Sequence, residues 1–247
     1  MADQVDQPAG RADIIVLTSL REQVLRRVAE SDSRITGLHE PWNHNHHYHR
    51  VIIGVIGPDC RHALDVGCGQ GTLTRQLRTR VSTVTGIDRD ERSIALARAR
   101  ADPQFRDICY IRGDFLTEPI TPESVDLVTA VASLHHMNPE AALRKMADVL
   151  RPGGILVVIG LARDASVADF LLVVPAAIGN LAHRFAHSWR CRGTRRSSEP
   201  CYQSPIIWPP ALTYRQARRV AEHVLPGVRY RRRLYWRYSL VWIKPER

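Results

Sequence analysis

From Arg61 onward, short apolar runs rich in Val, Ile and Leu alternate with longer stretches whose apolar residues recur at helical spacing. The apolar runs predict buried strands over residues 62–66, 82–88, 108–114, 124–133 and 155–160. The stretches between them predict helices over residues 71–80, 91–101 and 139–150, and a Pro-Gly-Gly turn at 152–154 should precede the fifth strand. Strands separated by helices form parallel sheets wound by right-handed crossovers, so we expect an α/β fold.

The two ends of the chain depart from this rhythm. Residues 14–30 predict a helix, and residues 51–57 are typical of the end of a second one. A further helix is expected over 213–224. Two strand-like segments follow, 228–236 and 237–244, which lie too close together for a crossover connection. We therefore expect these two strands to pair antiparallel.

The composition is ordinary for a folded protein except in its charge. Of the 247 residues, 44% are hydrophobic and 24% are charged, but the net charge is +10. Nearly all of the positive charge is arginine, whose planar head favours phosphate and carboxylate partners. A coding bias toward arginine explains the excess more simply. Net charge alone therefore does not indicate a nucleic-acid-binding protein.

Cysteine usage and the apolar runs favour a cytoplasmic protein. The five cysteines include no CxxC pair, so neither a disulfide framework nor a thiolate zinc site is indicated. The first residues are polar and do not resemble a signal peptide. The longest apolar run, 167–182, is interrupted by Asp169, Pro175 and Asn180 and is too short for a membrane span.

A glycine-rich loop follows the first predicted strand, in the segment LDVGCGQGTL (64–73). Three glycines allow a sharp turn and bring backbone amides close to a ligand: Gly67, Gly69 and Gly71. Such a loop by itself also serves nicotinamide and flavin cofactors. Asp88 ends the second strand, where a carboxylate can accept hydrogen bonds from both hydroxyls of a ribose. Asp65 stands at the entrance of the loop, where its charge repels a pyrophosphate and favours a ligand with an ammonium group.

Five segments now stand in a recognisable order: LDVGCGQGTL, GID (86–88), GDF (113–115), VDLVTAVASLHHM (125–137) and LRPGGIL (150–156). Together they resemble class I S-adenosylmethionine-dependent methyltransferases, most closely the small-molecule branch that includes ubiquinone and menaquinone biosynthesis enzymes. The resemblance is strong over about residues 40–160. It implies a Rossmann-like, doubly wound, seven-stranded sheet, mostly parallel with an antiparallel last strand and helices on both faces. It also implies S-adenosyl-L-methionine as the cofactor.

The resemblance further implies which residues bind the cofactor. Those that would hold its methionine end are Asp65, Gly67, Cys68 and Gly69. Asp88 would bind the ribose, and those expected beside the adenine are Arg89, Asp114 and Phe115. Val131 and Ala132, after the fourth strand, would line the sulfonium side. Cys68 and Val131 could instead serve only in packing.

On this interpretation the chain has four parts. Residues 1–60 carry the N-terminal helices and a lid over cofactor and acceptor, and residues 61–160 form the cofactor-binding core. Residues 161–212 are a lid insertion, and residues 213–247 add a terminal helix and a hairpin that completes the sheet.

A histidine pair, His135 and His136, follows the fourth predicted strand, where this family often places such a pair near the active site. An imidazole has a pKa near neutrality and could deprotonate a phenol or an enol, so His135 is a candidate catalytic base. Alternatively, one histidine caps the cofactor site and the other is structural, since many relatives act by proximity alone. The Asn/Asp-Pro-Pro-aromatic motif of amino-group methyltransferases is absent here, which disfavours a nucleic-acid base as acceptor.

The expected reaction is O- or C-methylation of a small, hydrophobic or aromatic acceptor. Two alternatives remain: an RNA or protein methyltransferase that uses the arginine-rich surface, and a cofactor-binding interaction module without turnover. Residues 167–196 mix apolar and basic side chains, which suits a greasy anionic acceptor or peripheral contact with an anionic membrane. Segment 229–238 alternates arginine and aromatic residues, but strand alternation explains this as well, so nucleic acid is not an expected partner.

A cluster of histidines precedes the first strand of the core: His44, His46, His47 and His49. A zinc or iron site is one interpretation, but apart from Glu40 no carboxylate or cysteine lies nearby, so no metal is expected. In this family the helix before the first strand often closes over the cofactor. On a helix, His44 and Tyr48 share one face, and Asn45 and His49 share another. We therefore expect Tyr48 or His49, together with His44, near the methionine end or the acceptor, with Tyr48 as a cofactor contact and His49 as a second candidate catalytic residue.

Overall fold

The computed structural model describes residues 44–100, 107–163, 210–233 and 236–246, with side chains from Tyr48 onward. The chain divides into two compact units, residues 1–58 and residues 59–247, and each is described by itself. The helix predicted over 14–30 and the segment 167–196 lie outside the described residues, as does nearly all of the lid insertion 161–212. What was expected of these segments stays a prediction.

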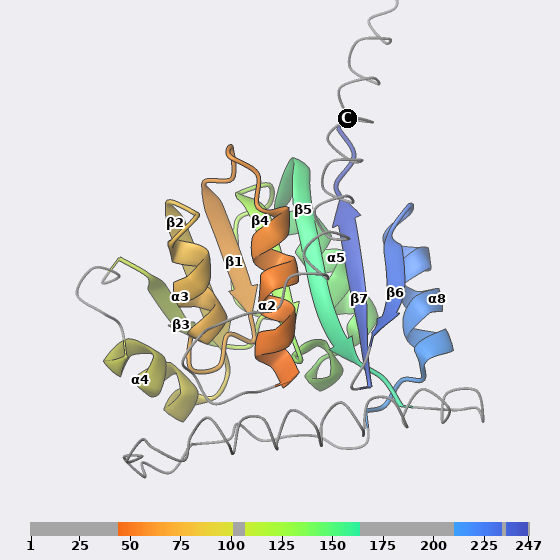
Figure 1. The fold of residues 1–247 in the computed structure, drawn as a ribbon, viewed down its shortest axis with the longest axis horizontal. Helices are drawn as coiled ribbons and strands as arrows, with labels where there is room; N and C mark the ends of the chain where they lie inside the picture. The colour runs from red at the N-terminus through yellow and green to blue at the C-terminus, as the bar shows by residue number, and fades with distance from the viewer. Residues whose placement is uncertain (1–43, 101–106, 164–209, 234–235, 247) are drawn as a thin grey trace, which may run out of the picture. The chain divides into compact units, whose positions relative to one another are not determined.

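The second unit is built on one seven-stranded sheet (Figure 1). Its strands are β1 His62–Val66, β2 Thr83–Asp88, β3 Cys109–Arg112, β4 Val125–Val131, β5 Leu150–Leu161, β6 Arg229–Arg233 and β7 Arg237–Ile243. Across the sheet they stand in the order β3-β2-β1-β4-β5-β7-β6. β7 runs antiparallel to both of its neighbours, and the other pairs are parallel. The predicted α/β sheet with an antiparallel C-terminal hairpin is confirmed.

Helices cover both faces of this sheet (Figure 1). The helices of this unit are α3 Thr72–Arg78, α4 Glu91–Ala99, α5 Pro139–Val149 and α8 Tyr214–Val224, with a short 3-10 helix, η2, at Leu134–His136. α3 and α4 pack on β1, β2 and β3, whereas α5 and α8 pack on each other and on β5 and β6. In the first unit, α2 spans His44–Val55, so the histidine cluster is helical. Within the described residues, no helix is both long and apolar enough to cross a membrane.

Local sequence signals set the helix starts. The Asn138 side chain accepts a hydrogen bond from Ala141 N–H at 3.0 Å, and Pro139 occupies the first turn, where its missing N–H is no loss. Thr213 and Gln216 form a reciprocal capping box that starts α8. Such caps contribute about 1 kcal/mol each, so these helices start where polar side chains satisfy their first amides.

Side-chain alternation along the strands divides the core between the two faces. The face under α5 and α8 holds the larger cluster, in which Val66, Val128 and Val158 are fully buried against Met146 and other apolar residues. The opposite face holds a smaller cluster under α4: Cys68, Ile94, Ala97, Ile108 and Tyr110. Burying each large aliphatic side chain stabilises the fold by about 1.5–3 kcal/mol. Strands buried on both faces explain why the parallel strands read as continuous apolar runs.

The Pro-Gly-Gly segment is not the simple turn that the sequence predicted. β5 already begins at Leu150 and runs through it as an irregularity in the pairing with β4. Val125 pairs with Leu150, but the next pair is Leu127 with Ile155. Gly153 adopts φ 75°, which favours glycine, and its N–H donates to the Lys244 carbonyl at 2.9 Å. The bond to the residue that follows β7 therefore keeps this segment beside the sheet.

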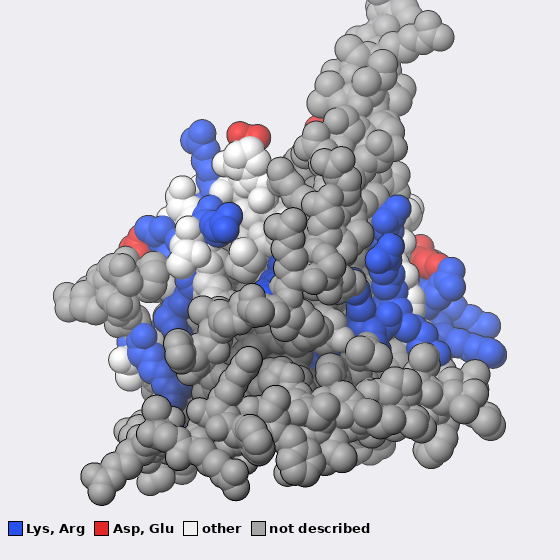
Figure 2. Space-filling view, viewed as in Figure 1, with Lys and Arg blue, Asp and Glu red and all other residues white. Residues whose placement is uncertain are grey.

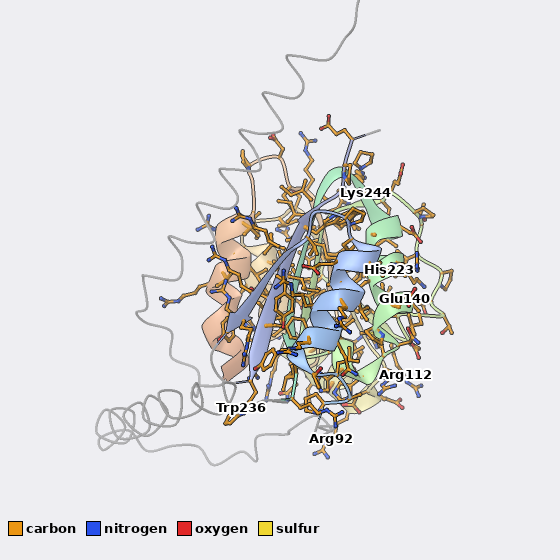
Figure 3. All side chains as sticks on the ribbon, turned by 90° about the vertical axis from the view of Figure 1, so that its right-hand side faces the viewer. Arg92, Arg112, Glu140, His223, Trp236 and Lys244 are labelled. Atoms are coloured by element: carbon orange, nitrogen blue, oxygen red, sulfur yellow. The ribbon has the colours of Figure 1, made fainter. Side chains whose placement is uncertain are left out.

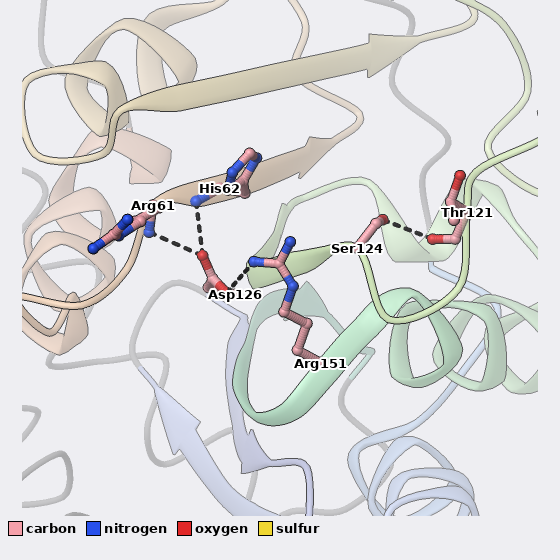
Figure 4. Close-up of polar contacts among 6 residues, drawn as sticks. All are labelled: Arg61, His62, Thr121, Ser124, Asp126 and Arg151. Carbon is pink, nitrogen blue, oxygen red and sulfur yellow. Dashed lines mark hydrogen bonds and ion pairs between the residues drawn. The ribbon is translucent and has the colours of Figure 1, made fainter.

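The Asp126 carboxylate links the amino ends of neighbouring parallel strands (Figure 4). Asp126 Oδ2 accepts hydrogen bonds from the backbone N–H groups of Arg61 and His62, each at 2.9 Å. Its Oδ1 accepts a bond of 2.7 Å from Arg151. Burial opposes ionisation of this carboxyl, but the two amides and Arg151 outweigh it and lower the pKa of Asp126. Asp126 thus ties β4, β5 and the start of β1 to one another.

Candidate active site

Most of the residues predicted to bind the cofactor follow the carboxyl ends of β1 to β4, at the lower edge of the sheet in Figure 1. Because these four strands are parallel, the loops that follow them meet at one edge. The order β2-β1-β4 also places the glycine loop where the winding of the sheet reverses direction. Ligands of open α/β sheets bind at such a switch point.

The glycine loop after β1 is shaped by three residues with left-handed backbone. Gly67, Gly69 and Gly71 have φ values of 71°, 54° and 74°. A Cβ on Gly67 would collide with Ser133, and one on Gly71 would collide with the Tyr110 ring, so these two glycines are required for packing. A Cβ on Gly69 would meet nothing within 4 Å. Gly69 is therefore the point at which this loop presents bare backbone to open space.

Asp88, at the end of β2, buttresses that loop. Its Oδ2 accepts the Gly69 N–H at 2.8 Å, and its Oδ1 accepts the Asp90 N–H at 2.9 Å. The carboxylate is half-buried, and each oxygen can accept a further bond. Asp88, which the sequence predicts to bind the ribose, thus contacts Gly69, where the loop backbone faces open space.

Asp65 lies beneath the loop and is 2% exposed. Its oxygens accept hydrogen bonds from Thr74 at 2.8 Å and Thr129 at 2.9 Å. Burial raises its pKa to about 6, with Asp88 acting in the same direction, although the two hydroxyl bonds oppose the rise. The carboxylate therefore ties β1 to α3 and β4 and places negative charge under the loop. Direct contact with a ligand ammonium group stays a prediction.

Cys68 is directed into the smaller core cluster with Ile94 and Tyr110. Burial raises the pKa of its thiol, and the nearby charges of Asp65 and Asp88 raise it further, so the sulfur remains protonated. A Cβ on Gly86 would crowd Cys68, which explains the glycine within β2. The geometry favours the packing role considered for Cys68, and cofactor contact through its backbone stays a prediction.

Asp114 and Phe115 follow β3, but their side chains point in different directions. Asp114 is exposed, and its Oδ1 accepts the Leu116 N–H at 2.9 Å. Phe115 is buried in the larger core cluster, with Lys145 Nζ 5.2 Å from its ring centroid. The loop is held to β2 by a bond of 3.0 Å from Gly113 N–H to the Asp88 carbonyl. Asp114 is thus the better placed of the two to reach an adenine.

A strained turn follows β4. Val131 is half-buried, and Ala132 has φ 51°, which is uncommon for a residue other than glycine. The Ala132 N–H donates to the Ile159 carbonyl at 2.8 Å, and the Ser133 hydroxyl donates to the Val66 carbonyl at 2.7 Å. These bonds join the carboxyl ends of β1, β4 and β5. Backbone strain of this kind gathers at functional sites.

The histidine pair lies in η2, directly after this turn. The two rings are 4.0 Å apart between centroids. His135 is half-buried, and neither of its ring nitrogens has a hydrogen-bond partner among the described residues. Burial lowers its pKa to about 4, with the charges of His136 and Arg237 adding to the effect. This corrects the assumption of a near-neutral pKa: His135 is uncharged at neutral pH and is a weak base.

The pKa of His136 responds to burial and to two neighbouring charges, those of Arg89 and Asp88. Burial lowers the pKa of His136, the charge of Arg89 lowers it further, and Asp88 opposes both. Arg89 itself is exposed. Arg89 directly follows Asp88 in the sequence, and its contact with the adenine stays a prediction.

Tyr48 and His49 belong to the other unit. Both are buried residues of α2. The two units are described separately, so their contact with cofactor or acceptor stays a prediction. Within the part of the chain that the structure describes, no group of three or more His, Cys, Asp or Glu side chains could hold a metal ion. The side chains of His44, His46 and His47 lie outside that part.

Comparisons with known proteins identify this arrangement. A sequence profile described as a methyltransferase domain matches residues 64–158. An uncharacterized methyltransferase of Mycobacterium bovis is 31% identical over 209 residues, which cover 83% of this chain and 98% of that protein. The chain belongs to the class I S-adenosylmethionine-dependent methyltransferases. A ubiquinone biosynthesis O-methyltransferase of Coxiella burnetii is 28% identical to the methyltransferase over 130 residues, 52% of this chain and 56% of that protein.

The fold of this methyltransferase is shared with solved structures. A S-adenosylmethionine-dependent methyltransferase from Methanosarcina mazei superposes with a TM-score of 0.54 at 17% identity, covering 80% of this chain and 98% of that chain. The cofactor is S-adenosyl-L-methionine. The carboxyl edge fits it, because Gly69 presents open backbone there and Asp88 supplies a carboxylate with acceptor capacity to spare.

Sequence reasoning missed several residues that shape this site. They are Thr74, Gly86, Tyr110, Thr129 and Ser133. Thr129 and Ser133 are polar residues in an otherwise apolar segment, which was the available signal. Their bonds to Asp65 and Val66 span more than 60 residues of sequence and became visible only in the structure.

Proposed function

We propose that this methyltransferase methylates an oxygen or a carbon atom of a small, hydrophobic or aromatic acceptor. The observation that carries the proposal is His135, an uncharged imidazole beside the strained turn with no described hydrogen-bond partner for either nitrogen. An uncharged imidazole in a poorly solvated site suits a neutral acceptor, a phenol or an enol, whose O–H group donates one hydrogen bond to it.

The proposed cofactor contacts follow the geometry of the edge. The backbone at Gly67 and Gly69 runs along the methionine end, over the negative charge of Asp65. Asp88 accepts from the ribose hydroxyls with the lone pairs that the Gly69 and Asp90 amides leave unused. Arg89 and Asp114 flank the adenine, and Val131 and Ala132 line the sulfonium side. When bound, S-adenosyl-L-methionine supplies a methyl group activated by its sulfonium charge.

The residues of the chain then contribute alignment more than base strength. His135 accepts a hydrogen bond from the acceptor and takes its proton as the methyl group is transferred, so that one proton leaves for each methyl gained. With a pKa of about 4, His135 is too weak a base to ionise a phenol beforehand. Proximity and exclusion of water therefore supply most of the rate.

A relative supports the choice of acceptor. The Coxiella burnetii protein is named a ubiquinone biosynthesis O-methyltransferase, and its 28% identity extends over 130 residues of this chain. Because this chain spans 56% of that protein's length, its acceptor class carries over only as part of the proposal.

The arginine-rich surface gives the RNA or protein alternative little added support. Lys and Arg side chains gather over β6, β7 and α8 at the right of Figure 2. Three of the described aromatic rings there are engaged within the protein, because Tyr230 stacks on Tyr238 at 5.4 Å and Arg232 lies over the Tyr214 ring at 4.0 Å. Single-strand binders instead offer aromatic faces to bases.

A tritiated-methyl assay tests the proposed function. The protein is incubated with labelled cofactor and cell extract, which is then separated into small molecules, RNA and protein. We expect label among the small molecules, and much less of it when Asp88→Ala replaces the wild type at a limiting cofactor concentration. Label confined to RNA or protein would contradict the proposal, and no label in any fraction would favour a non-catalytic module.

A further inference from the structure

Lysine is rare in this chain. Lys145 and Lys244 are its only two lysines, and every other permanently charged basic side chain is arginine. Both ammonium groups bond backbone carbonyls, and Lys244 Nζ donates to that of Leu150 at 2.8 Å. An ammonium is a compact cation with three rotatable donors, whereas a guanidinium is a planar fork. The ammonium can therefore bond carbonyls that face it from different directions, which the fork does less well.

Lys145 lies on α5, and its side chain reaches the loop that follows β3. Its Nζ donates to the carbonyls of Leu116 at 3.1 Å and Glu118 at 2.6 Å. The same atom lies 5.2 Å from the centroid of the Phe115 ring, within range of a cation–π interaction. Figure 3 shows Arg112, the last residue of β3, toward the lower end of the sheet, so this loop lies at the carboxyl edge. Three contacts thus fix the loop to a helix that is distant in sequence.

The contacts of Lys145 bear on Asp114, because one turn of backbone joins them. The Asp114 carbonyl accepts the N–H groups of Thr117 at 3.1 Å and Glu118 at 2.9 Å. Its carboxylate Oδ1 accepts the Leu116 N–H at 2.9 Å. Asp114 therefore bonds to the amides of Leu116 and Glu118, the same two residues whose carbonyls bond to Lys145.

The same turn carries two carboxylates. The Glu118 side chain folds back over Gly113, since a Cβ on that glycine would lie 2.5 Å from Glu118 Oε2. Asp114 stands beside it on the same turn, and like charges at this spacing repel. The ammonium of Lys145, bonded to this turn, offsets that repulsion. Without it, both the hydrogen bonds and the charge balance that hold Asp114 in place would be weakened.

We infer that Lys145 is a positioning residue for the cofactor: it holds the turn after β3 so that the Asp114 carboxylate accepts the amino group of the adenine. The inference rests on the proposed function and on the place given there to Asp114 beside the adenine. With Oδ1 held by the Leu116 N–H, Oδ2 is the oxygen that accepts this amino group. Lys145 acts through the turn and not by contact with the cofactor.

Calorimetry with two ligands that differ only in the base tests this role. S-adenosylhomocysteine carries the adenine amino group, and S-inosylhomocysteine carries an oxo group in its place. We expect the wild type to bind the adenosyl ligand about tenfold or more tighter, because a carboxylate accepts from an amino group and repels an oxo oxygen. Asp114→Asn and Lys145→Met should each reduce this preference severalfold. Lys145→Arg, which keeps the cation, should retain part of it.

A double-mutant cycle separates positioning from a general loss of stability. If Lys145 acts through Asp114, adding Lys145→Met to Asp114→Asn should change the preference little further. The matched control is Arg144→Gln, which removes an exposed arginine paired with Glu140 on the same helix and should leave the preference at its wild-type value. If Lys145→Met does not fold by circular dichroism, Lys145→Gln takes its place with the same expected outcome.

Three results would overturn the role of Lys145. They are an unchanged preference in Lys145→Met, an equal loss of affinity for both ligands, and effects of the two substitutions that simply add. A preference that falls in Asp114→Asn but not in Lys145→Met would leave the adenine contact standing. A wild type without any preference, or Asp114→Asn with full preference, would remove the adenine contact and the role of Lys145 together. The labelled-methyl assay decides independently whether a small molecule is methylated.

Discussion

Asp88 has a structural role and a proposed binding role: its carboxylate accepts the Gly69 N–H at 2.8 Å and is proposed to bind the ribose. We expect Asp88→Ala to weaken binding of S-adenosylhomocysteine by about tenfold to a hundredfold, since a charged acceptor of two hydrogen bonds is lost. Calorimetry measures this directly. The exposed Asp107, which pairs with Arg78 at 2.7 Å, provides the control Asp107→Asn. Unchanged affinity in Asp88→Ala would refute the ribose assignment.

Gly67 and Gly69 should respond differently to the same substitution. Gly67→Ala places a methyl group against Ser133 in a left-handed backbone, so we expect a fall in unfolding free energy of about 2 kcal/mol or more. Gly69→Ala adds its methyl group to open space, so only about 1 kcal/mol of backbone strain is expected. Its main effect should be loss of cofactor affinity. Thermal unfolding together with calorimetry on both variants checks the contrast, which a Gly69→Ala variant with full affinity would contradict.

His135 should make stability depend on pH in a defined window. Its pKa is about 4 in the folded protein against an ordinary value of 6.5, so between these values the unfolded chain binds more protons. Stability from the uncharged ring is therefore fully kept above pH 6.5 and is lost as pH falls toward 4. We expect the difference in unfolding free energy between wild type and His135→Gln to shrink over that window and to be flat above it.

Urea unfolding at pH 7.5, 6 and 5 measures this difference. The exposed His223 on α8 supplies the control His223→Gln. A difference that stays constant across these pH values would show that His135 is not held uncharged by its surroundings.

At the scale of elements, Asp126 links three strands at the amino edge of the sheet. Asp126→Ala leaves two backbone amides and Arg151 without their acceptor, so we expect a loss of about 2–4 kcal/mol in unfolding free energy. Cofactor affinity should hold, because the site lies at the opposite edge. Glu140→Gln, which breaks an exposed ion pair of 2.8 Å on α5, should cost well under 1 kcal/mol. If Asp126→Ala lost much of its cofactor affinity at a temperature where it stays folded, the amino edge would not be separate from the cofactor site.

The same scale shows where local patterns are insufficient. The strand at 62–66 was predicted at its observed bounds because its apolar run ends in glycines, a purely local signal. The Pro-Gly-Gly segment was taken for a turn for an equally local reason. It continues β5 because Gly153 N–H donates to the carbonyl of Lys244, the residue that follows β7 near the far end of the chain. Turn residues do not end a strand when a distant segment supplies hydrogen-bond partners for their backbone N–H and C=O groups.

At the scale of the whole molecule, we predict that His49 of α2, in the first unit, contributes to catalysis. We expect His49→Ala to reduce turnover by about tenfold or more, as for a residue that orients a reacting group, while cofactor affinity changes little. We predict that removal of metal by a chelator leaves wild-type activity intact, because the sulfonium already activates the methyl group for transfer. The control is His223→Ala. Activity lost to the chelator and restored by zinc would instead assign the histidine cluster to a metal site.

The sequence by itself determined the alternating elements, the antiparallel hairpin, the glycine loop and the cofactor, because periodicity, turn residues and ordered motifs are local properties. It also singled out Asp88, because this acidic residue ends the second predicted strand. Tertiary structure decided what each side chain meets. Asp65 accepts a hydrogen bond from Thr129 across 64 residues, Cys68 faces the core, and burial of the ring lowers the pKa of His135. Burial and long-range charge set these properties, including the low pKa of His135, and neither is contained in a local pattern.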